Sequence, residues 1–165
     1  MQRGPAPSGK DASVAAEDSL KPSEADTTVS RIMPASITRE DLVAFAISLK
    51  GIPYHEAGAN PDIGFDCSGF ITYVFHHFAL IVPRSSVDFT NYGKEISLHA
   101  AQKGDLILFT GTDSTVRIVG HMGIVTENTD SLRFIHSTSG RQYGVTVTAL
   151  NEYYRRRFVK VIDVF

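Results

Sequence analysis

The sequence predicts an α+β domain in which helices precede an antiparallel sheet of five or six strands. Two stretches with apolar residues at helical spacing come first, and five short strand-like stretches follow them. Helices followed by successive strands are typical of α+β domains rather than of parallel α/β domains. The 165 residues suggest one domain, and a hydrophobic content of 42% is sufficient for a core.

The first helix is expected to begin after Thr38, which is a favourable N-cap residue. Glu40 and Asp41 then place acidic side chains in the first turn, where the helix dipole favours negative charge. Apolar residues recur at helical spacing as far as Leu49, and Gly51 is expected to end the helix.

The second helix is expected over residues 67–79. Its apolar face is formed by residues at helical spacing, namely Phe70, Ile71, Val74, Phe75 and Phe78. Cys67 lies one turn before this face, so we expect the cysteine at the N-terminal end of the helix and on its packed side.

The rest of the chain is predicted to form strands. The apolar or alternating stretches that indicate them cover residues 106–109, 121–126, 132–136, 145–150 and 157–164. The stretch 111–119 is longer than a minimal turn, and we expect it to shape a groove beside the sheet.

Residues 1–31 contain few large apolar side chains and predict a disordered tail or tether ahead of a domain over residues 32–165.

The 16 basic and 18 acidic residues give a net charge of −2, which does not indicate nucleic-acid binding or electrostatic membrane binding. No apolar run is long enough for a membrane span. The start of the chain also lacks the apolar core of a signal peptide. We therefore expect either a cytoplasmic protein or one whose export signal has been removed.

Cys67 is the only cysteine and the candidate nucleophile. Unpaired N–H groups and the dipole at a helix start favour thiolate over thiol, so we expect a lowered pKa. The same N–H groups can donate to an oxyanion that forms on a substrate carbonyl. A lone cysteine on an apolar helix face is more often an inert buried residue. The polar, glycine-bounded setting of residues 66–69 favours the reactive interpretation.

His121 and His136 are the candidate partners of the cysteine. His121 opens one predicted strand and His136 closes the next, with a turn-like segment at residues 127–131 between them. A hairpin centred between Asn128 and Thr129 would place the histidines directly opposite each other, with Cβ atoms about 5 Å apart. We predict that His121 is the base and that His136 orients it and fixes its tautomer.

A zinc site is the alternative use of one cysteine and two histidines. The short paired spacing of many zinc ligands is absent from this sequence. We therefore expect neither a metal nor a cofactor, and we interpret the other four histidines as structural residues.

Several segments, taken in order, resemble the NlpC-type cysteine peptidases that cut bacterial cell-wall peptides. They are Gly51-Ile52-Pro53-Tyr54, Phe65-Asp66-Cys67-Ser68-Gly69-Phe70, Pro83-Arg84-Ser85-Ser86, Gly104-Asp105-Leu106, Gly120-His121-Met122-Gly123 and Phe134-Ile135-His136-Ser137. The resemblance spans roughly residues 37–165.

The resemblance implies a papain-like fold in which the cysteine helix packs against a sheet that carries both histidines. It also implies hydrolysis of peptidoglycan stem peptides between γ-D-glutamyl and a diamino acid, either meso-diaminopimelate or lysine. Such a substrate places the protein in the cell envelope, in the periplasm or anchored to the outer membrane. A lipoprotein tethered through residues 1–31 fits that location, and we expect a monomer.

The resemblance also implies roles for residues near the cysteine. Tyr54 matches a tyrosine whose hydroxyl assists the oxyanion, and Asp66 and Ser68 match residues that help to bind the free amine of the peptide. Simpler interpretations are a packed loop aromatic for Tyr54, an N-cap for Asp66 and a tolerated first-turn residue for Ser68. Arg84 is interpreted as structural or peripheral.

Two other functions stay open on the sequence. One is acyl transfer or lipid hydrolysis on a related thiol scaffold, which a hydrophobic tunnel would favour over a polar cleft. The other is an inactive module that binds wall peptides, although the presence of Cys67, His121 and His136 speaks against lost activity.

Overall fold

The computed structural model describes residues 32–165, so the predicted tail at residues 1–31 lies outside the described residues. The helices are α1 (Arg39–Ser48), α2 (Cys67–His77) and α3 (Glu152–Arg157), with 3₁₀ turns η1 (Ser86–Asn91) and η2 (Leu98–Ala100). The strands are β1 (Ala59–Asn60), β2 (Gly64–Phe65), β3 (Lys94–Ile96), β4 (Leu106–Thr110), β5 (Val119–Asn128), β6 (Leu132–Thr138), β7 (Gly144–Ala149) and β8 (Phe158–Asp163).

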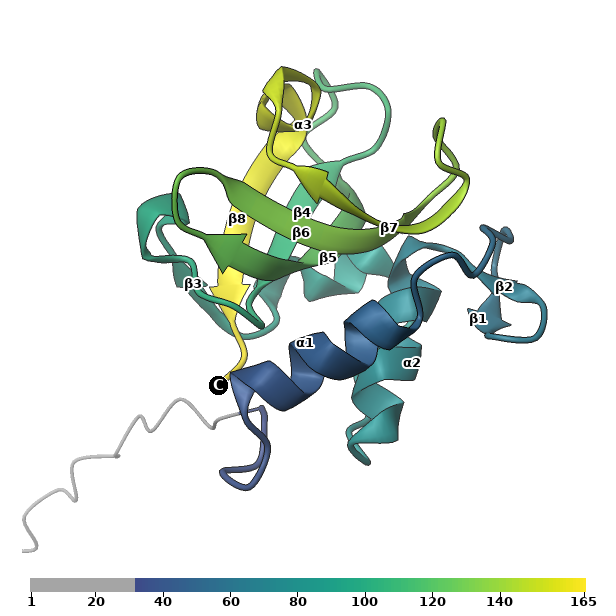
Figure 1. The fold of residues 1–165 in the computed structure, drawn as a ribbon. Coiled ribbons are helices and arrows are strands. Elements are labelled where there is room, and N and C mark those ends of the chain that lie inside the picture. The colour runs from purple at the N-terminus through teal and green to yellow at the C-terminus, as the bar shows by residue number, and fades with distance from the viewer. Residues whose placement is uncertain (1–31) are drawn as a thin grey trace, which may run out of the picture.

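Six strands form one antiparallel sheet in the order β3-β8-β4-β5-β6-β7, which confirms the predicted α+β architecture. Helices α1 and α2 lie together on one side of the sheet, and α3 lies at the far end of the molecule (Figure 1). No helix within residues 32–165 combines the length and the apolar character needed to cross a bilayer.

The starts of the two long helices follow from their caps. Thr38 and Asp41 form a reciprocal capping box at the start of α1, as the predicted N-cap requires. In α2 the Asp66 side chain accepts a hydrogen bond from the Gly69 N–H at 2.6 Å. The cap therefore places Cys67 as the first helical residue, in agreement with the predicted helix start.

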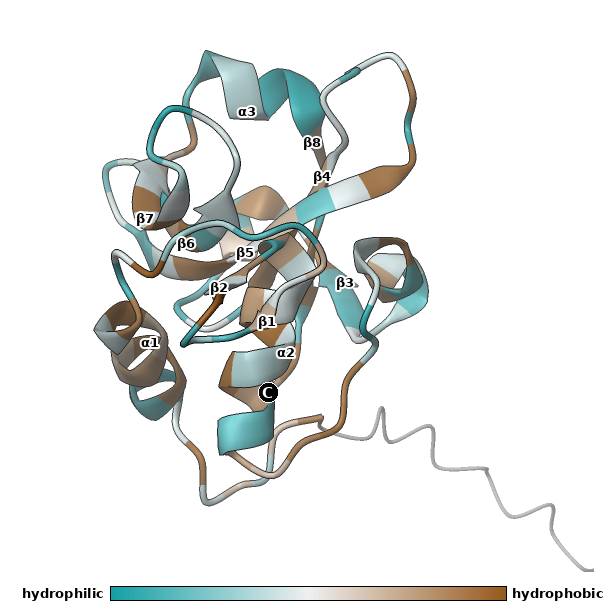
Figure 2. Ribbon diagram, turned by 90° about the vertical axis from the view of Figure 1, so that its right-hand side faces the viewer, coloured by the Kyte–Doolittle hydropathy of each residue, from teal (hydrophilic) through white to brown (hydrophobic). Residues whose placement is uncertain are grey.

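The sheet is buried on both faces, since every residue of β4 is buried and its first four residues are apolar. Leu106 and Leu108 pack with α1 and α2, whereas Ile107 and Phe109 pack with Phe134, Tyr154 and neighbouring apolar residues on the other face. Figure 2 shows hydrophobic segments along the central strands and α2, while the short helix α3 is mostly hydrophilic.

The short strands β1, β2 and β3, the two 3₁₀ turns and helix α3 were not predicted. Strand β3 is a three-residue edge strand with mostly exposed side chains, so it has no apolar alternation to detect. Helix α3 has only six residues, and its last residue, Arg157, was predicted to begin a strand. That strand begins at Phe158 instead, since Asn151 caps α3 and its helical turn continues through Arg157.

The predicted register of the β5–β6 hairpin was wrong. The strands pair Asn128 with Leu132 and Ile124 with Ile135, with a bulge between Val125 and Glu127. This register places His136 opposite Gly123, two residues from His121. The bulge and the longer connection shift the pairing, but a shift of two residues keeps both histidines on one face.

A charged cluster ties α1 to the sheet. The Arg39 guanidinium donates to the fully buried Asp105 carboxylate at 2.5 Å and to the Asp163 carboxylate at 2.8 Å. The Gln102 N–H donates to the other oxygen of Asp105 at 2.7 Å. Because both oxygens of Asp105 are engaged, this cluster fixes the start of β4 against the first helix.

Replacing Asp105 by Ala should lower the free energy of unfolding by about 3 kcal/mol, because it removes one partner of a buried ion pair. Urea denaturation measures the effect. The control is Glu40→Ala, which removes the exposed pair between Glu40 and Lys103 at 3.9 Å and should leave stability nearly unchanged. Equal effects of the two substitutions would contradict the assignment.

Candidate active site

Cys67 lies where the start of α2 meets the start of β5. Its Sγ donates a hydrogen bond to the carbonyl oxygen of Gly120 at 3.8 Å, and Gly120 directly precedes His121. Cys67 and His121 also line the same cleft. The fold therefore brings the predicted nucleophile and base together, although in this geometry the thiol hydrogen bond goes to the backbone beside the histidine.

The expected lowering of the Cys67 pKa was wrong. Burial of the thiol and the negative charge of Asp66 raise the pKa of Cys67 to about 11, against smaller lowering effects of the backbone N–H groups of Ser68 and Cys67 and of the Arg84 charge. The helix start acts in the predicted direction, but desolvation outweighs it. The resting nucleophile is therefore a neutral thiol that must give up its proton to a base.

The two histidines form a direct hydrogen bond. His121 Nε2 and His136 Nδ1 lie 2.7 Å apart, and the rings meet edge to face. His136 Nε2 lies 2.9 Å from the hydroxyl of Thr148 on β7. The predicted pair is thus confirmed as neighbours, joined diagonally across β5 and β6 rather than directly opposite.

These bonds define a consistent set of tautomers, which we infer from the hydrogen-bond network. His121 carries its proton on Nε2 and donates to His136 Nδ1, and His136 donates from Nε2 to the Thr148 hydroxyl. Nδ1 of His121 is then free of a proton and can accept one. The chain of three side chains therefore prepares His121 as a base.

Burial keeps both imidazoles neutral. It lowers the pKa of His121 well below its ordinary value, with further lowering by His136 and Arg157. Burial, together with the Arg157 charge, lowers the pKa of His136 to about 3. His121 is consequently a proton acceptor rather than an imidazolium at neutral pH.

Two glycines make this packing possible. A Cβ at Gly123 would come within 2.8 Å of the Ile135 carbonyl oxygen and within 3.2 Å of the His136 Cβ. A Cβ at Gly69 would come within 1.9 Å of the Gly58 carbonyl oxygen. The lack of a side chain at Gly123 leaves room beside His136. The lack of a side chain at Gly69 lets the first turn of α2 approach the loop that carries Gly58.

The cleft beside Cys67 has a volume of about 810 Å³ and polar as well as aromatic walls, with Tyr54 on its border. Burial raises the pKa of Tyr54, and Cys67 and Asp66 add to the rise, so its hydroxyl keeps its proton and can donate.

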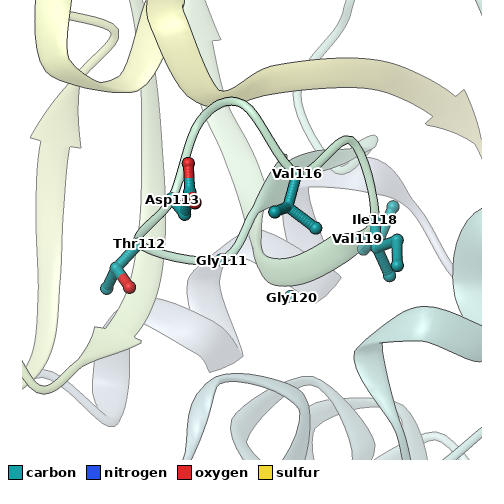
Figure 3. Close-up of a pocket in the computed structure, with 7 residues that line it drawn as sticks. All are labelled: Gly111, Thr112, Asp113, Val116, Ile118, Val119 and Gly120. Atoms are coloured by element: carbon teal, nitrogen blue, oxygen red, sulfur yellow. The ribbon is translucent and has the colours of Figure 1, made fainter.

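The β4–β5 connection forms another wall of the cleft. Figure 3 shows Val116 and Ile118 of this loop beside an adjoining pocket of about 350 Å³. Gly111, Thr112 and Gly120 line both spaces, in agreement with the expected shaping of a groove.

Asp66 and Ser68 lie on the other side of the cysteine and are already engaged. Arg84 donates to the two carboxylate oxygens of Asp66 at 3.1 and 2.8 Å and to the Ser68 hydroxyl at 2.9 Å. The N-cap interpretation of Asp66 is confirmed, and Arg84, interpreted as structural or peripheral, lines the pocket beside Cys67. Any amine that binds here must approach a carboxylate that is paired with a guanidinium.

Thr148, Tyr154 and Arg157 complete the surroundings of the histidines and were not identified from the sequence. The Tyr154 ring packs 5.4 Å from the His136 ring and 6.1 Å from the His121 ring. Arg157 lies over the same tyrosine at 5.4 Å. The spacing of Tyr154 and Arg157 on a helical turn could have indicated a shared face, but their short helix was not recognised.

The geometry disfavours the zinc alternative. The ring nitrogens that join His121 and His136 face each other rather than a common centre with Cys67. Within residues 32–165 no group of three or more His, Cys, Asp or Glu side chains is arranged to hold a metal ion.

Comparisons with known proteins agree with the motifs. The model of the NlpC/P60 family matches residues 51–163. The bifunctional muramidase/DL-endopeptidase CwlT of Bacillus subtilis is 35% identical over 104 residues, which are 63% of this chain and 31% of that protein. The murein DD-endopeptidase MepS/murein LD-carboxypeptidase of Escherichia coli is 35% identical over 111 residues, 66% of this chain and 54% of that protein. The chain thus spans between about a third and a half of the length of these relatives.

The fold agrees with solved structures as well. A crystal structure of an NlpC/P60 family protein from Bacillus cereus superposes with a TM-score of 0.68 at 28% identity, covering 78% of this chain and 40% of the other. The matched family segment contains Cys67, His121 and His136 together with the whole six-stranded sheet. The resemblance drawn from the motifs is confirmed, and the chain belongs to the NlpC/P60 family.

Proposed function

We propose that this chain is a cysteine endopeptidase that hydrolyses peptidoglycan stem peptides between γ-D-glutamyl and a diamino acid. The observation that carries the proposal is a partly exposed thiol at a helix start, in one cleft with a histidine that a second histidine orients. The family and the activities named for the relatives support peptide substrates from the cell wall.

The first half of the proposed reaction forms a thioester. His121 Nδ1 takes the proton of the Cys67 thiol as the sulfur attacks the amide carbonyl carbon. The backbone N–H of Cys67 and the Tyr54 hydroxyl donate to the oxyanion. The proton on His121 then passes to the leaving amine, and the C–N bond breaks.

The second half releases the acyl group. His121, neutral again, takes a proton from water, and the resulting hydroxide attacks the thioester carbonyl. The thiolate leaves and recovers its proton from His121. Throughout both halves, the bond to His136 holds the ring of His121 and stabilises the imidazolium that forms transiently.

The two alternatives have less support. The cleft is lined by arginine, amide and hydroxyl side chains as well as by tyrosines, unlike a hydrophobic tunnel, which disfavours a lipid substrate. A binding module without activity does not require the buried chain from His121 through His136 to Thr148, because that chain has no role in binding a peptide.

Purified stem peptides and cross-linked peptide dimers test the bond that is cleaved. Mass spectrometry should detect L-Ala-γ-D-Glu as the product from stem peptides, in line with the DL-endopeptidase activity in the name of the B. subtilis relative. Release of monomers from dimers with intact stems would instead indicate a DD-endopeptidase, as the E. coli relative is named.

We further propose that the protein acts in the cell envelope. The activities named for the relatives concern the cell wall, and this coarse location follows from the substrate. Anchoring through residues 1–31 and a monomeric state are predictions from the sequence analysis. Cell fractionation of the full chain and its sedimentation in solution test them.

Replacing Cys67 by Ala should reduce peptide hydrolysis by about 10³-fold or more, since the variant cannot form the thioester. Thermal unfolding should be little changed, because the substitution removes one sulfur atom from a partly exposed position. The control is His99→Ala, at an exposed position outside the cleft, which should retain full activity. Normal hydrolysis by the Cys67→Ala variant would end the proposal.

The pH profile of kcat/KM should be flat from about pH 6.5 to pH 9. The reacting form of the enzyme has a neutral Cys67 thiol and a neutral His121 imidazole. Neither group titrates in this range, because the Cys67 pKa lies near 11 and the His121 pKa lies well below 6.5. Initial rates across this range, with folding followed by circular dichroism, provide the measurement. An acidic limb centred near 6.5 would show that His121 titrates as an ordinary histidine and would contradict the proposed resting state.

A further inference from the structure

The two sides of Cys67 differ in charge. On one side, Tyr54, Glu56, Asp66 and Arg84 line a pocket that contains both carboxylates and a guanidinium. On the other side, the larger cleft contains two cations, Arg141 and Arg157, and no Asp or Glu side chain lines it. This difference is not a consequence of overall charge, since the chain carries a net charge of −2.

Arg157 is a buried cation in this cleft. Only 7% of the residue is exposed, and its guanidinium donates to the carbonyl oxygens of Gly111 at 2.9 Å and Thr110 at 3.0 Å and to the Tyr153 hydroxyl at 2.7 Å. All three acceptors are neutral. Within residues 32–165 no carboxylate lies within ion-pair distance of Arg157, although such burial usually requires a counter-charge.

Part of this guanidinium is still available to a ligand. A guanidinium has five N–H groups, and the three hydrogen bonds leave one on each terminal nitrogen. Two parallel N–H groups match the two oxygens of a carboxylate. Arg141 adds a second, exposed charge to the lining of the cleft, in the connection between β6 and β7.

We propose that the cleft lined by Arg141 and Arg157 binds a free carboxylate on the leaving side of the scissile bond. This inference rests on the proposed function and deepens it by orienting the substrate. The amine-bearing end of the stem peptide lies over Asp66, and the diamino acid with its carboxylate lies toward Arg157. The enzyme should therefore prefer a leaving residue with a free carboxylate over the same residue with an amide.

Three synthetic peptides test the proposal. The first is L-Ala-γ-D-Glu-meso-diaminopimelic acid, the second has both carboxylates of the diaminopimelic acid converted to amides, and the third has only the α-carboxylate of the glutamyl residue converted to an amide. The native chain should show about a five- to tenfold higher KM for the second peptide than for the first, with a smaller effect on kcat. The third peptide should behave like the first.

Two variants connect this preference to the arginines. Arg141→Gln, at an exposed position, should reduce the preference about threefold without affecting folding. Arg157→Lys keeps the positive charge but loses the paired N–H donors of the guanidinium, and it should abolish most of the preference. The control is Arg155→Gln, which removes a neighbouring exposed arginine that does not line the cleft and should change nothing.

The outcomes separate the two proposals. Equal KM values for the first two peptides would overturn the carboxylate site while leaving the peptidase function intact. A discrimination confined to the third peptide would move the carboxylate to the acyl side and would also overturn the proposal. Failure to cleave any of the peptides, with the Cys67→Ala variant as the reference, would count against the proposed function itself. If Arg157→Lys does not fold, the Arg141→Gln result still decides the matter.

Discussion

The hydrogen bond between His121 and His136 is the interaction on which the candidate site depends. The bond is 2.7 Å long and buried, so it stays in place without competition from water. It gives His121 a single orientation and leaves one nitrogen of its ring to receive a proton. Without it, Cys67 would face a histidine of undefined tautomer, and a thiol with a pKa of about 11 would have no effective base.

The sheet supplies this bond through a diagonal contact. A directly opposed pair would have placed the two rings side by side, whereas the observed register puts Gly123 opposite His136 and leaves space for the ring of His121 to reach across. The aromatic ring of Tyr154 packs against both imidazoles from α3. The same packing removes the pair from water, and desolvation is the main reason that both histidines remain neutral.

The charged side chains around Cys67 are distributed unevenly, and this distribution can orient a charged substrate. Asp66 caps α2, raises the thiol pKa and is itself paired with Arg84, so one residue links helix formation to the reactivity of the nucleophile. Arg157 holds the β4–β5 connection through two carbonyl oxygens and leaves its positive charge within the cleft. A substrate that carries an amine at one end and a carboxylate at the other matches this polarity.

The α+β class, the cap and start of α2 and the identity of the three central side chains could be predicted from the sequence, because caps, apolar spacing and short motifs are local properties. The hairpin register could not, since a bulge at Thr126 has no local signal, and neither could the short helix that supplies Tyr154 and Arg157. The sign of the Cys67 pKa shift was also decided by tertiary structure. The helix start that lowers this pKa is determined by the residues next to Cys67 in the sequence. The burial that outweighs it arises only when distant segments pack around the sulfur.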